Sequence, residues 1–351
     1  MAPASTTDLL FFTLTSAIAL FLQKRGGGDC SSVGDKQECA AKAEPALKNS
    51  AFVFIKPHAN TEATRSLVKS KLIEAGLDIL SECDISGPEI DEKKLIDQHY
   101  YAIASKATIL PAKDIPVPTD KFLDAFGEKW EDALASGKAC NAMEACAKFG
   151  CSADELNAAW GGAKVTKFGG GFYCGLVTLN GQSLYVFNAF FMSMRSKFVG
   201  AEDSIHCYEV EWKPDVLSWS DFRNNLLGPT DPADGPAGSI RKTILEQWEA
   251  LGLSSLPNKG DNGVHASASP FEGLAEKNNW LKRDLSSDAF GAALLAAGLS
   301  KETIEEWSVD PRVELPGGEG KGSVFDALED MDAAECLSKL VELNELNAGV
   351  V

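Results

Sequence analysis

The stretch Ala51-Phe52-Val53-Phe54-Ile55-Lys56-Pro57 joins an unbroken apolar run to a lysine and a proline. An apolar run of this length, bounded by proline, is typical of a strand buried in the centre of a sheet. Residues 61–75 follow as a predicted helix, because their apolar positions keep helical spacing and Gly76 ends the run. Residues 77–85 predict a second strand and residues 89–103 a second helix. The folded part of the chain therefore begins as strand, helix, strand, helix.

Composition limits the function classes. The 351 residues suffice for a sizeable core and more than one unit. The formal net charge of −18 argues against a protein that coats nucleic acid or anionic lipid, since both require basic surface, although a local basic site for phosphates remains compatible. Cys140, Cys146 and Cys151 lack Cys-x-x-Cys spacing and a nearby histidine, so we interpret them as reduced cysteines rather than zinc ligands.

A second informative stretch is Asn262-Gly263-Val264-His265-Ala266-Ser267, in a polar turn between small residues. A neutral imidazole is a good nucleophile near pH 7, and phosphorylating it would divide one difficult phosphoryl transfer into two easier ones. Such a histidine is more often a surface or hydrogen-bonding residue, so its neighbours decide. Upstream, residues 227–241 form a long loop of Gly, Pro and polar residues that ends in a cation, Arg241.

These stretches together resemble the nucleoside diphosphate kinase family. The matching motifs are Ile55-Lys56-Pro57, His99-Tyr100, Thr230 to Arg241, and Asn262 to His265. Ser267, Glu276 and Trp280 also keep the family's spacing after the histidine. The resemblance covers about 51–103 and 204–282. It implies an α+β fold, whose core is a ferredoxin-like βαββαβ domain with an antiparallel sheet.

The resemblance also implies roles for individual residues. His265 would be the nucleophile that forms a phosphohistidine, Ser267 and Glu276 would fix its ring, and Tyr100 would donate to the transferring phosphoryl group. The residues implied in binding the nucleotide and its phosphates are Lys56, Arg223, Thr230, Arg241 and Asn262. No residue is predicted as a metal ligand, because Mg²⁺ would be carried on the nucleotide phosphates.

Three positions depart from the family pattern. The family's phosphate-binding arginine falls at Asn224, and Arg223 lies one residue earlier, about 100° away on a regular helix. The aspartate that follows Lys-Pro in many members is His58. The residue that stacks on the base falls near Thr108, which leaves the base contacts undefined while the phosphotransfer residues are nearly complete.

The pattern divides the chain into four regions. Residues 51–282 form the predicted kinase-like domain, interrupted at about 104–203 by an inserted α/β subdomain that contains a hairpin around Asn180-Gly181. Residues 283–351 form a helical C-terminal extension, and residues 26–50 a linker. Gly317 to Gly322 lacks the spacing of a phosphate-binding loop and is also interpreted as linker.

Residues 9–22 are uncharged and apolar, and Lys24 and Arg25 follow them. A helix of this length rises about 21 Å, short of a hydrocarbon core of about 30 Å. The segment is either a membrane anchor or targeting sequence within residues 1–25, or a helix packed on the protein itself. If it is an anchor, the positive-inside rule leaves the catalytic domain in the cytosol. The predicted location is therefore cytoplasmic or membrane-associated, and organelle targeting stays open.

The predicted function is transfer of the terminal phosphate of ATP or another nucleoside triphosphate to a nucleoside diphosphate, by a ping-pong mechanism through His265. The alternatives are a catalytically weak nucleotide-binding scaffold and a membrane-tethered adaptor, each using the insertion as its interaction surface. The insertion also predicts a homo-oligomer smaller than the family's hexamer, because about a hundred added residues would obstruct some of the usual contacts.

Overall fold

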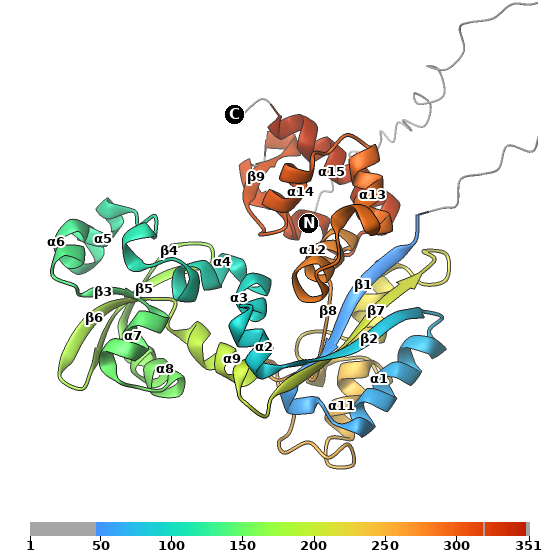
Figure 1. Ribbon diagram of the computed structural model, residues 1–351, viewed down its shortest axis with the longest axis horizontal. Helices are drawn as coiled ribbons and strands as arrows, with labels where there is room; N and C mark the ends of the chain where they lie inside the picture. The colour runs from blue at the N-terminus through green and yellow to red at the C-terminus, as the bar shows by residue number, and fades with distance from the viewer. Residues whose placement is uncertain (1–46, 319, 349–351) are drawn as a thin grey trace, which may run out of the picture. The chain divides into compact units, whose positions relative to one another are not determined.

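Strand β1 (Asn49–Ile55) is an inner strand of a four-stranded antiparallel sheet in the computed structural model, which describes residues 47–318 and 320–348 (Figure 1). Across the sheet the strands are β2 (Asp78–Ser86), β7 (Ser204–Trp212), β1 and β8 (Val264–Ala266). Counted in chain order this is 2-3-1-4, the strand order of a ferredoxin-like fold. The predicted mixture of helices with an antiparallel sheet is therefore confirmed. The segment of residues 9–22 and most of the predicted linker lie outside the described residues.

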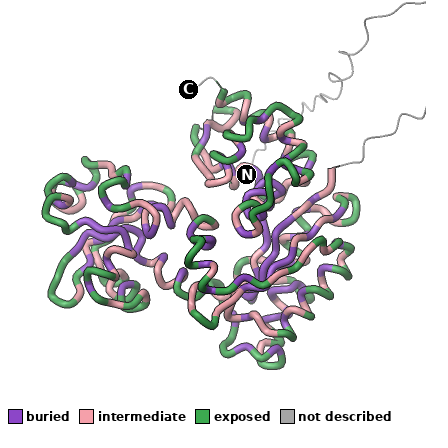
Figure 2. Tube along the Cα trace, in the orientation of Figure 1, coloured by how far each residue is buried: buried purple, intermediate pink, exposed green. Residues whose placement is uncertain are grey.

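The side chains of β1 alternate between two cores. Val53 and Ile55 pack with helices α1 (Glu62–Glu74) and α11 (Ile240–Glu246) on one face of the sheet. Phe52 and Phe54 point to the other face, which helix α12 (Pro270–Leu281) helps to cover (Figure 1). Figure 2 shows the buried residues running along these strands. Burying both faces of β1 explains why its sequence is uniformly apolar.

The predicted helix over residues 89–103 is wrong as a single helix. The chain forms α2 (Gly87–Glu92), α3 (Leu95–His99) and α4 (Tyr101–Ala104) instead. Lys94 has φ 52°, a left-handed conformation that an α-helix cannot contain, and Tyr100 has φ −105°. The second break places His99 and Tyr100 at the junction of two short helices, rather than inside one.

Residues between α4 and β7 build a separate sheet with the order β3-β6-β5-β4. Its strands are β3 (Ala139–Asn141), β4 (Lys164–Gly169), β5 (Phe172–Leu179) and β6 (Gln182–Phe187). The predicted hairpin is confirmed, with Asn180 and Gly181 both at positive φ. The helices here are α5 (Thr119–Phe126), α6 (Trp130–Ala135), α7 (Ala142–Phe149), α8 (Ala153–Gly161) and α9 (Phe190–Val199). The sequence predicts one helix over residues 121–135 and another over 142–160, and each is broken, at left-handed Gly127 and Gly150.

The C-terminal extension is helical, but its last helix starts at Ala333, whereas the sequence predicts a helix over residues 324–346 with Ser323 as its N-cap. Its helices are α13 (Ala289–Ala296), α14 (Lys301–Trp307) and α15 (Ala333–Asn347). Ser323, the expected N-cap of the last helix, accepts instead from the backbone N–H of Asp326 in a short turn. The expected linker also contains a strand, β10 (Gly320–Ser323), which pairs with β9 (Arg312–Leu315).

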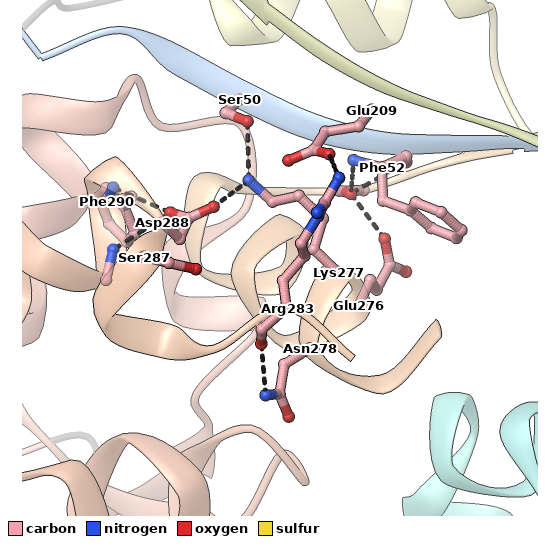
Figure 3. A network of polar contacts seen from close by, with 12 residues as sticks. Ser50, Phe52, Glu209, Glu276, Lys277, Asn278, Arg283, Ser287, Asp288 and Phe290 are labelled. Atoms are coloured by element: carbon pink, nitrogen blue, oxygen red, sulfur yellow. Dashed lines mark hydrogen bonds and ion pairs between the residues drawn. The ribbon is translucent and has the colours of Figure 1, made fainter. Parts of the chain in front are cut away.

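Buried polar contacts fasten this extension to the sheet domain. The Lys277 ammonium, 1% exposed, donates to the Ser50 hydroxyl at 2.7 Å and to the Asp288 carboxylate at the start of α13 (Figure 3). Asp288 in turn accepts from the backbone N–H groups of Phe290 and Gly291. A buried ammonium is costly unless it is paired and hydrogen-bonded, so these contacts make α12 and α13 one packed unit. Over the residues that the structure describes, no helix combines the length and apolar character needed to cross a membrane.

Candidate active site

His265 lies in the middle of β8, opposite Phe54 of β1. Gly263 starts this strand at φ 89°, a conformation that glycine adopts freely, and a Cβ there would lie 3.0 Å from the Ile244 side chain. The His58 ring accepts from the Gly263 N–H at 3.1 Å, which gives a structural role to the residue that departs from the family pattern. Val264 and Ala266 enter the core, so alternation puts the His265 ring on the opposite face, stacked on Phe54 with 4.7 Å between ring centroids.

The His265 ring is held through one nitrogen. Its Nε2 lies 2.6 Å from Glu276 Oε1, and the other oxygen of Glu276 accepts from the Ser267 hydroxyl at 2.6 Å. Ser267 is fixed in turn, because its hydroxyl accepts from the Phe52 N–H at 2.9 Å. Within residues 47–318 and 320–348, no hydrogen bond engages His265 Nδ1. With the ring proton on Nε2, facing Glu276, Nδ1 keeps the lone pair that a nucleophile requires.

Helix α12 supplies the carboxylate that orients this ring. Ser269 caps the helix by accepting from the Glu272 N–H at 3.2 Å, and Pro270 occupies its first turn. Glu272 and Glu276, four residues apart, share one face of the helix. Both carboxyl groups are buried, which raises the pKa of Glu272 well above its ordinary value and that of Glu276 to about 8. Glu272 therefore adds a second carboxyl group of raised pKa beside the one that holds His265.

His99 completes the surroundings of the ring. Its Nδ1 accepts from the indole N–H of Trp280 at 3.3 Å and lies 3.3 Å from Glu276 Oε1. Burial lowers the pKa values of His99 and His265 well below the ordinary value for histidine. Cations contribute to the effect at His265, where Lys56 and Arg241 act in the same direction. Both imidazoles are thus neutral at pH 7, the state in which a histidine can attack phosphorus.

Arg241 is 9% exposed, and within the described residues its guanidinium donates to backbone carbonyls alone. Its guanidinium donates to Val264 O at 3.0 Å and to Gly228 O at 2.9 Å, which fixes the side chain between the loop and β8. Burial lowers its pKa to about 10, and burial together with Arg241 lowers the pKa of Lys56 to about 8. Among the residues that the structure describes, neither cation has a carboxylate within ion-pairing distance. Two desolvated, unpaired cations indicate a site for an anion.

The loop that carries Thr230 is tied to the histidine motif. Asn262 donates through its amide to Thr230 O at 3.0 Å, while its buried side-chain oxygen finds no hydrogen-bond partner in the part of the chain that the structure describes. An unpartnered buried acceptor is uncommon in proteins and is available to a hydroxyl donor of a ligand.

Arg223, which lies one residue before the position of the family's phosphate-binding arginine, reaches the site through a local change of helix type. Helix α10 (Trp219–Asp221) continues as η4 (Phe222–Leu227), whose backbone has π-helical hydrogen bonding. A π-turn accommodates one extra residue within a helix and is frequent at functional sites. Arg223 and Asn224 consequently both line the cavity described next.

A cavity of about 400 Å³ gathers most of the predicted residues. Those that line it are Lys56, Tyr100, Arg223, Thr230, Arg241, Asn262 and His265. Ser267 and Glu276 stand behind the histidine, as the predicted support for its ring. Burial, and then Glu276 and Glu272, raise the pKa of Tyr100 to about 12, so its hydroxyl remains a hydrogen-bond donor at neutral pH.

Thr108, the position expected near the base, does not line this cavity. It is buried, and its hydroxyl donates to Asp97. An adjoining cavity of about 350 Å³ shares Lys56 and Tyr100 with the first and brings in Phe190 of α9. This aromatic residue comes from the C-terminal end of the insertion, about eighty positions from where sequence spacing placed it.

Sequence reasoning missed roles for His99 and Glu272. His99 belongs to the quoted His-Tyr motif, and Glu272 precedes Glu276 by one helical turn, so both signals were present. His99, His265 and Glu276 place their ligand atoms within 4.8 Å of one another, close enough to hold a metal ion. Two of these atoms are already engaged with each other, in the hydrogen bond between His265 Nε2 and Glu276, and His99 Nδ1 accepts from Trp280.

Comparison with known proteins gives a limited result. No family model matches the chain, and no curated protein matches it. Similar solved structures include the apo nucleoside diphosphate kinase from Encephalitozoon cuniculi, at 14% identity and a TM-score of 0.33, covering 67% of this chain and 90% of that one. The kinase from Aquifex aeolicus has 12% identity and a TM-score of 0.33, with 66% and 94% covered. That from Borrelia burgdorferi, with bound vanadate and ADP, has 15% identity and a TM-score of 0.30, with 67% and 87% covered. TM-scores near 0.3 are too low to support a functional conclusion, which must rest on the cavity itself.

Proposed function

We propose that the protein is a phosphotransferase that exchanges the terminal phosphate between nucleoside triphosphates and nucleoside diphosphates through His265. The observation that carries the proposal is one juxtaposition. Over the described residues, the neutral imidazole makes no hydrogen bond through Nδ1, and it lines the same cavity as Arg241 and Lys56, two cations that have no carboxylate within ion-pairing distance there. Phosphoryl transfer needs little more than an aligned nucleophile and fixed positive charge in a largely dry site.

In the first half-reaction, His265 Nδ1 attacks the terminal phosphorus and the bond from that phosphorus to the bridging oxygen breaks. The nucleoside diphosphate leaves, and an N–P bond remains on the ring. Phosphorylation makes the imidazole a stronger acid, and the Glu276 carboxylate stabilises the Nε2–H that faces it. In the second half-reaction, a terminal oxygen of another nucleoside diphosphate attacks the same phosphorus, and the N–P bond breaks.

The other residues bind and orient. Arg241 and Lys56 would neutralise phosphate oxygens, and Thr230 and Tyr100 would donate hydroxyl hydrogen bonds. The unpartnered oxygen of Asn262 suits a ribose hydroxyl. The cavity beside Phe190 offers an apolar surface for the base, next to Lys56 and Tyr100, which it shares with the phosphate cavity.

Mg²⁺ fits this site as a companion of the nucleotide. Glu272 is the one carboxyl group among the described residues that line the phosphate cavity, so the protein offers little for a dedicated Mg²⁺ site. Bound to the phosphates, the ion would supply charge neutralisation there.

Steady-state exchange between ATP and a second nucleoside diphosphate tests the proposal. Wild type should give the parallel double-reciprocal lines of ping-pong kinetics, and His265→Ala should remove exchange while leaving nucleotide binding largely intact. Glu305→Gln, an exposed change on α14, is the matched control and should behave as wild type. Exchange by His265→Ala at the wild-type rate would refute the proposal and favour another nucleophile. Nucleotide binding by wild type without any exchange would favour the scaffold alternative.

A further inference from the structure

The C-terminal extension reaches the phosphate cavity at Arg223. Its guanidinium Nη1 lies 2.5 Å from Glu329 Oε1 and 3.1 Å from Asp330 Oδ1. These carboxylates follow Arg223 by more than a hundred residues, in the segment that precedes α15. The contact therefore joins a wall of the cavity to a part of the chain that lies outside the ferredoxin-like domain.

The segment with these carboxylates is fastened at several points. Asp330 has φ 63°, and its N–H donates to Ala268 O at 3.0 Å, next to the histidine motif. Two residues later, Asp332 accepts from the Trp219 N–H at 2.8 Å and from the Asn49 side chain at 2.7 Å. The carboxylates thus sit on a fixed turn, which can impose a position on a flexible partner.

Both ion pairs use the same nitrogen of Arg223. A guanidinium has five N–H donors, and occupying Nη1 leaves the planar pair formed by Nε and Nη2. Across the described part of the chain, neither of these nitrogens donates to a protein group. A pair of parallel donors matches two oxygens of a phosphate, so the geometry holds the arginine by one side and leaves the other open.

Arg223 benefits from such a restraint. It is the cavity cation on the π-helical turn, and its side chain is 25% exposed, against 9% for the whole of Arg241. Fixing a free arginine costs up to about 2 kcal/mol of side-chain entropy, and a partner that fixes it beforehand removes that cost from ligand binding.

We propose that Glu329 and Asp330 are positioning residues that orient Arg223 for the nucleotide phosphates, so that the C-terminal extension completes the active site. This inference rests on the proposed function, because it takes phosphates as the ligand. The opposite role is competition, in which the carboxylates withhold Arg223 from the ligand. The two roles predict affinity changes of opposite sign.

A double-mutant cycle on the full chain separates these roles. The variants are Arg223→Ala, Glu329→Ala with Asp330→Gly, and the combination of all three, with glycine chosen because it tolerates the φ of Asp330. Affinity for Mg·ADP and for AMP is measured by calorimetry. Positioning predicts that Arg223→Ala and the carboxylate pair each weaken Mg·ADP about tenfold, the scale of one charged hydrogen bond, with no further loss in combination. The loss for AMP should be smaller, because AMP has fewer phosphate oxygens to bind.

Two further variants act as controls. Glu329→Gln with Asp330→Asn keeps the acceptor oxygens and should retain most of the affinity, which also covers the case in which the Ala/Gly variant fails to fold. Glu305→Gln with Glu306→Gln removes two exposed carboxylates from the same extension and should change nothing.

Other results of these binding measurements would contradict the positioning role. Tighter Mg·ADP binding in the carboxylate variants would overturn positioning in favour of competition. Losses that add in the combined variant would also overturn it, since the carboxylates would then act independently of Arg223. Wild type that binds Mg·ADP without exchanging phosphate contradicts the proposed function alone, and the cycle still decides this inference. Wild type that binds no nucleotide overturns both.

Discussion

Glu276 should control the pH dependence of catalysis, because it decides which nitrogen of His265 carries the proton. When Glu276 is ionised, it accepts from Nε2–H and leaves the Nδ1 lone pair free. When it is protonated, it donates to Nε2 and forces the ring proton onto Nδ1, which cannot then attack phosphorus. Burial raises its pKa to about 8, so the unreactive state prevails at neutral pH in the free protein.

The size of the effect follows from that pKa. With a value of about 8, roughly a tenth of the molecules are ionised at pH 7 and roughly nine tenths at pH 9, so the rate should rise about tenfold between them. His99 and His265 stay neutral over this range, since burial lowers both pKa values, and Tyr100 stays protonated with a pKa of about 12. Lys56 is the competing group, because its own pKa of about 8 would reduce phosphate binding as the pH rises.

The assay is the single-turnover rate of phosphorylation by Mg·ATP from pH 6.5 to 9. Saturating nucleotide is used because bound phosphates keep Lys56 charged. Glu276→Gln has no titrating group at this position, so its profile should be flat and its rate at pH 9 below that of wild type. Glu272→Gln is the matched control on the same helix face and should keep a rising profile, since it leaves the carboxyl group of Glu276 in place. A flat wild-type profile, or an equal rise in Glu276→Gln, would refute the reasoning.

Three further predictions concern Arg241, Gly263 and the oligomeric state. Arg241→Ala should cost about 3–4 kcal/mol in transition-state stabilisation, which is a loss of several hundredfold in kcat/KM. Its melting temperature should fall only by the few degrees expected for two lost hydrogen bonds. A large fall in melting temperature with normal turnover per folded molecule would contradict this. Gly263→Ala should slow phosphorylation and destabilise the fold by about 1–2 kcal/mol or more, because it adds left-handed backbone strain and a close contact with Ile244. Gly252→Ala is the control for the strain alone, since Gly252 has a similar φ and no neighbour within 4 Å of the added Cβ. Equal phosphorylation rates in the two variants would contradict the role of the Ile244 contact. Light scattering should give a mass below that of a hexamer, and a hexameric mass would show that the insertion leaves the assembly surfaces open.

Local patterns were sufficient for the strands β1, β2 and β7 and for helix α12, but not for β8 or β10. His265 itself was expected in a polar turn and lies instead in the short strand β8. The strand predicted over residues 204–212 and the helix predicted over residues 270–281 have the bounds of β7 and α12. These features depend on periodicity and on short spacings, which a single sequence contains. The support of His265 by Ser267 and Glu276 was expected from the family resemblance, which these two residues help to carry.

What sequence reasoning could not predict depends on distant contacts and on single backbone conformations. The break at Lys94 is one left-handed residue inside an otherwise helical pattern, and nothing in the spacing marks it. The π-turn that brings Arg223 to the cavity is a matter of hydrogen-bond register. Its partners Glu329 and Asp330 lie far along the chain, in a region predicted as plain helix.

The central claim is that His265 Nδ1 carries the phosphoryl group between nucleotides. The direct measurement is to expose the protein to Mg·ATP labelled in the terminal phosphate, without an acceptor, and to map the modified atom by mass spectrometry and ³¹P NMR at alkaline pH. We predict one acid-labile, base-stable phosphate on His265, attached at Nδ1 because Nε2 faces Glu276, and its discharge by a second nucleoside diphosphate. A wild-type protein that binds Mg·ATP but takes up no such label, or that is labelled at Nε2 or at a hydroxyl group, would contradict the account.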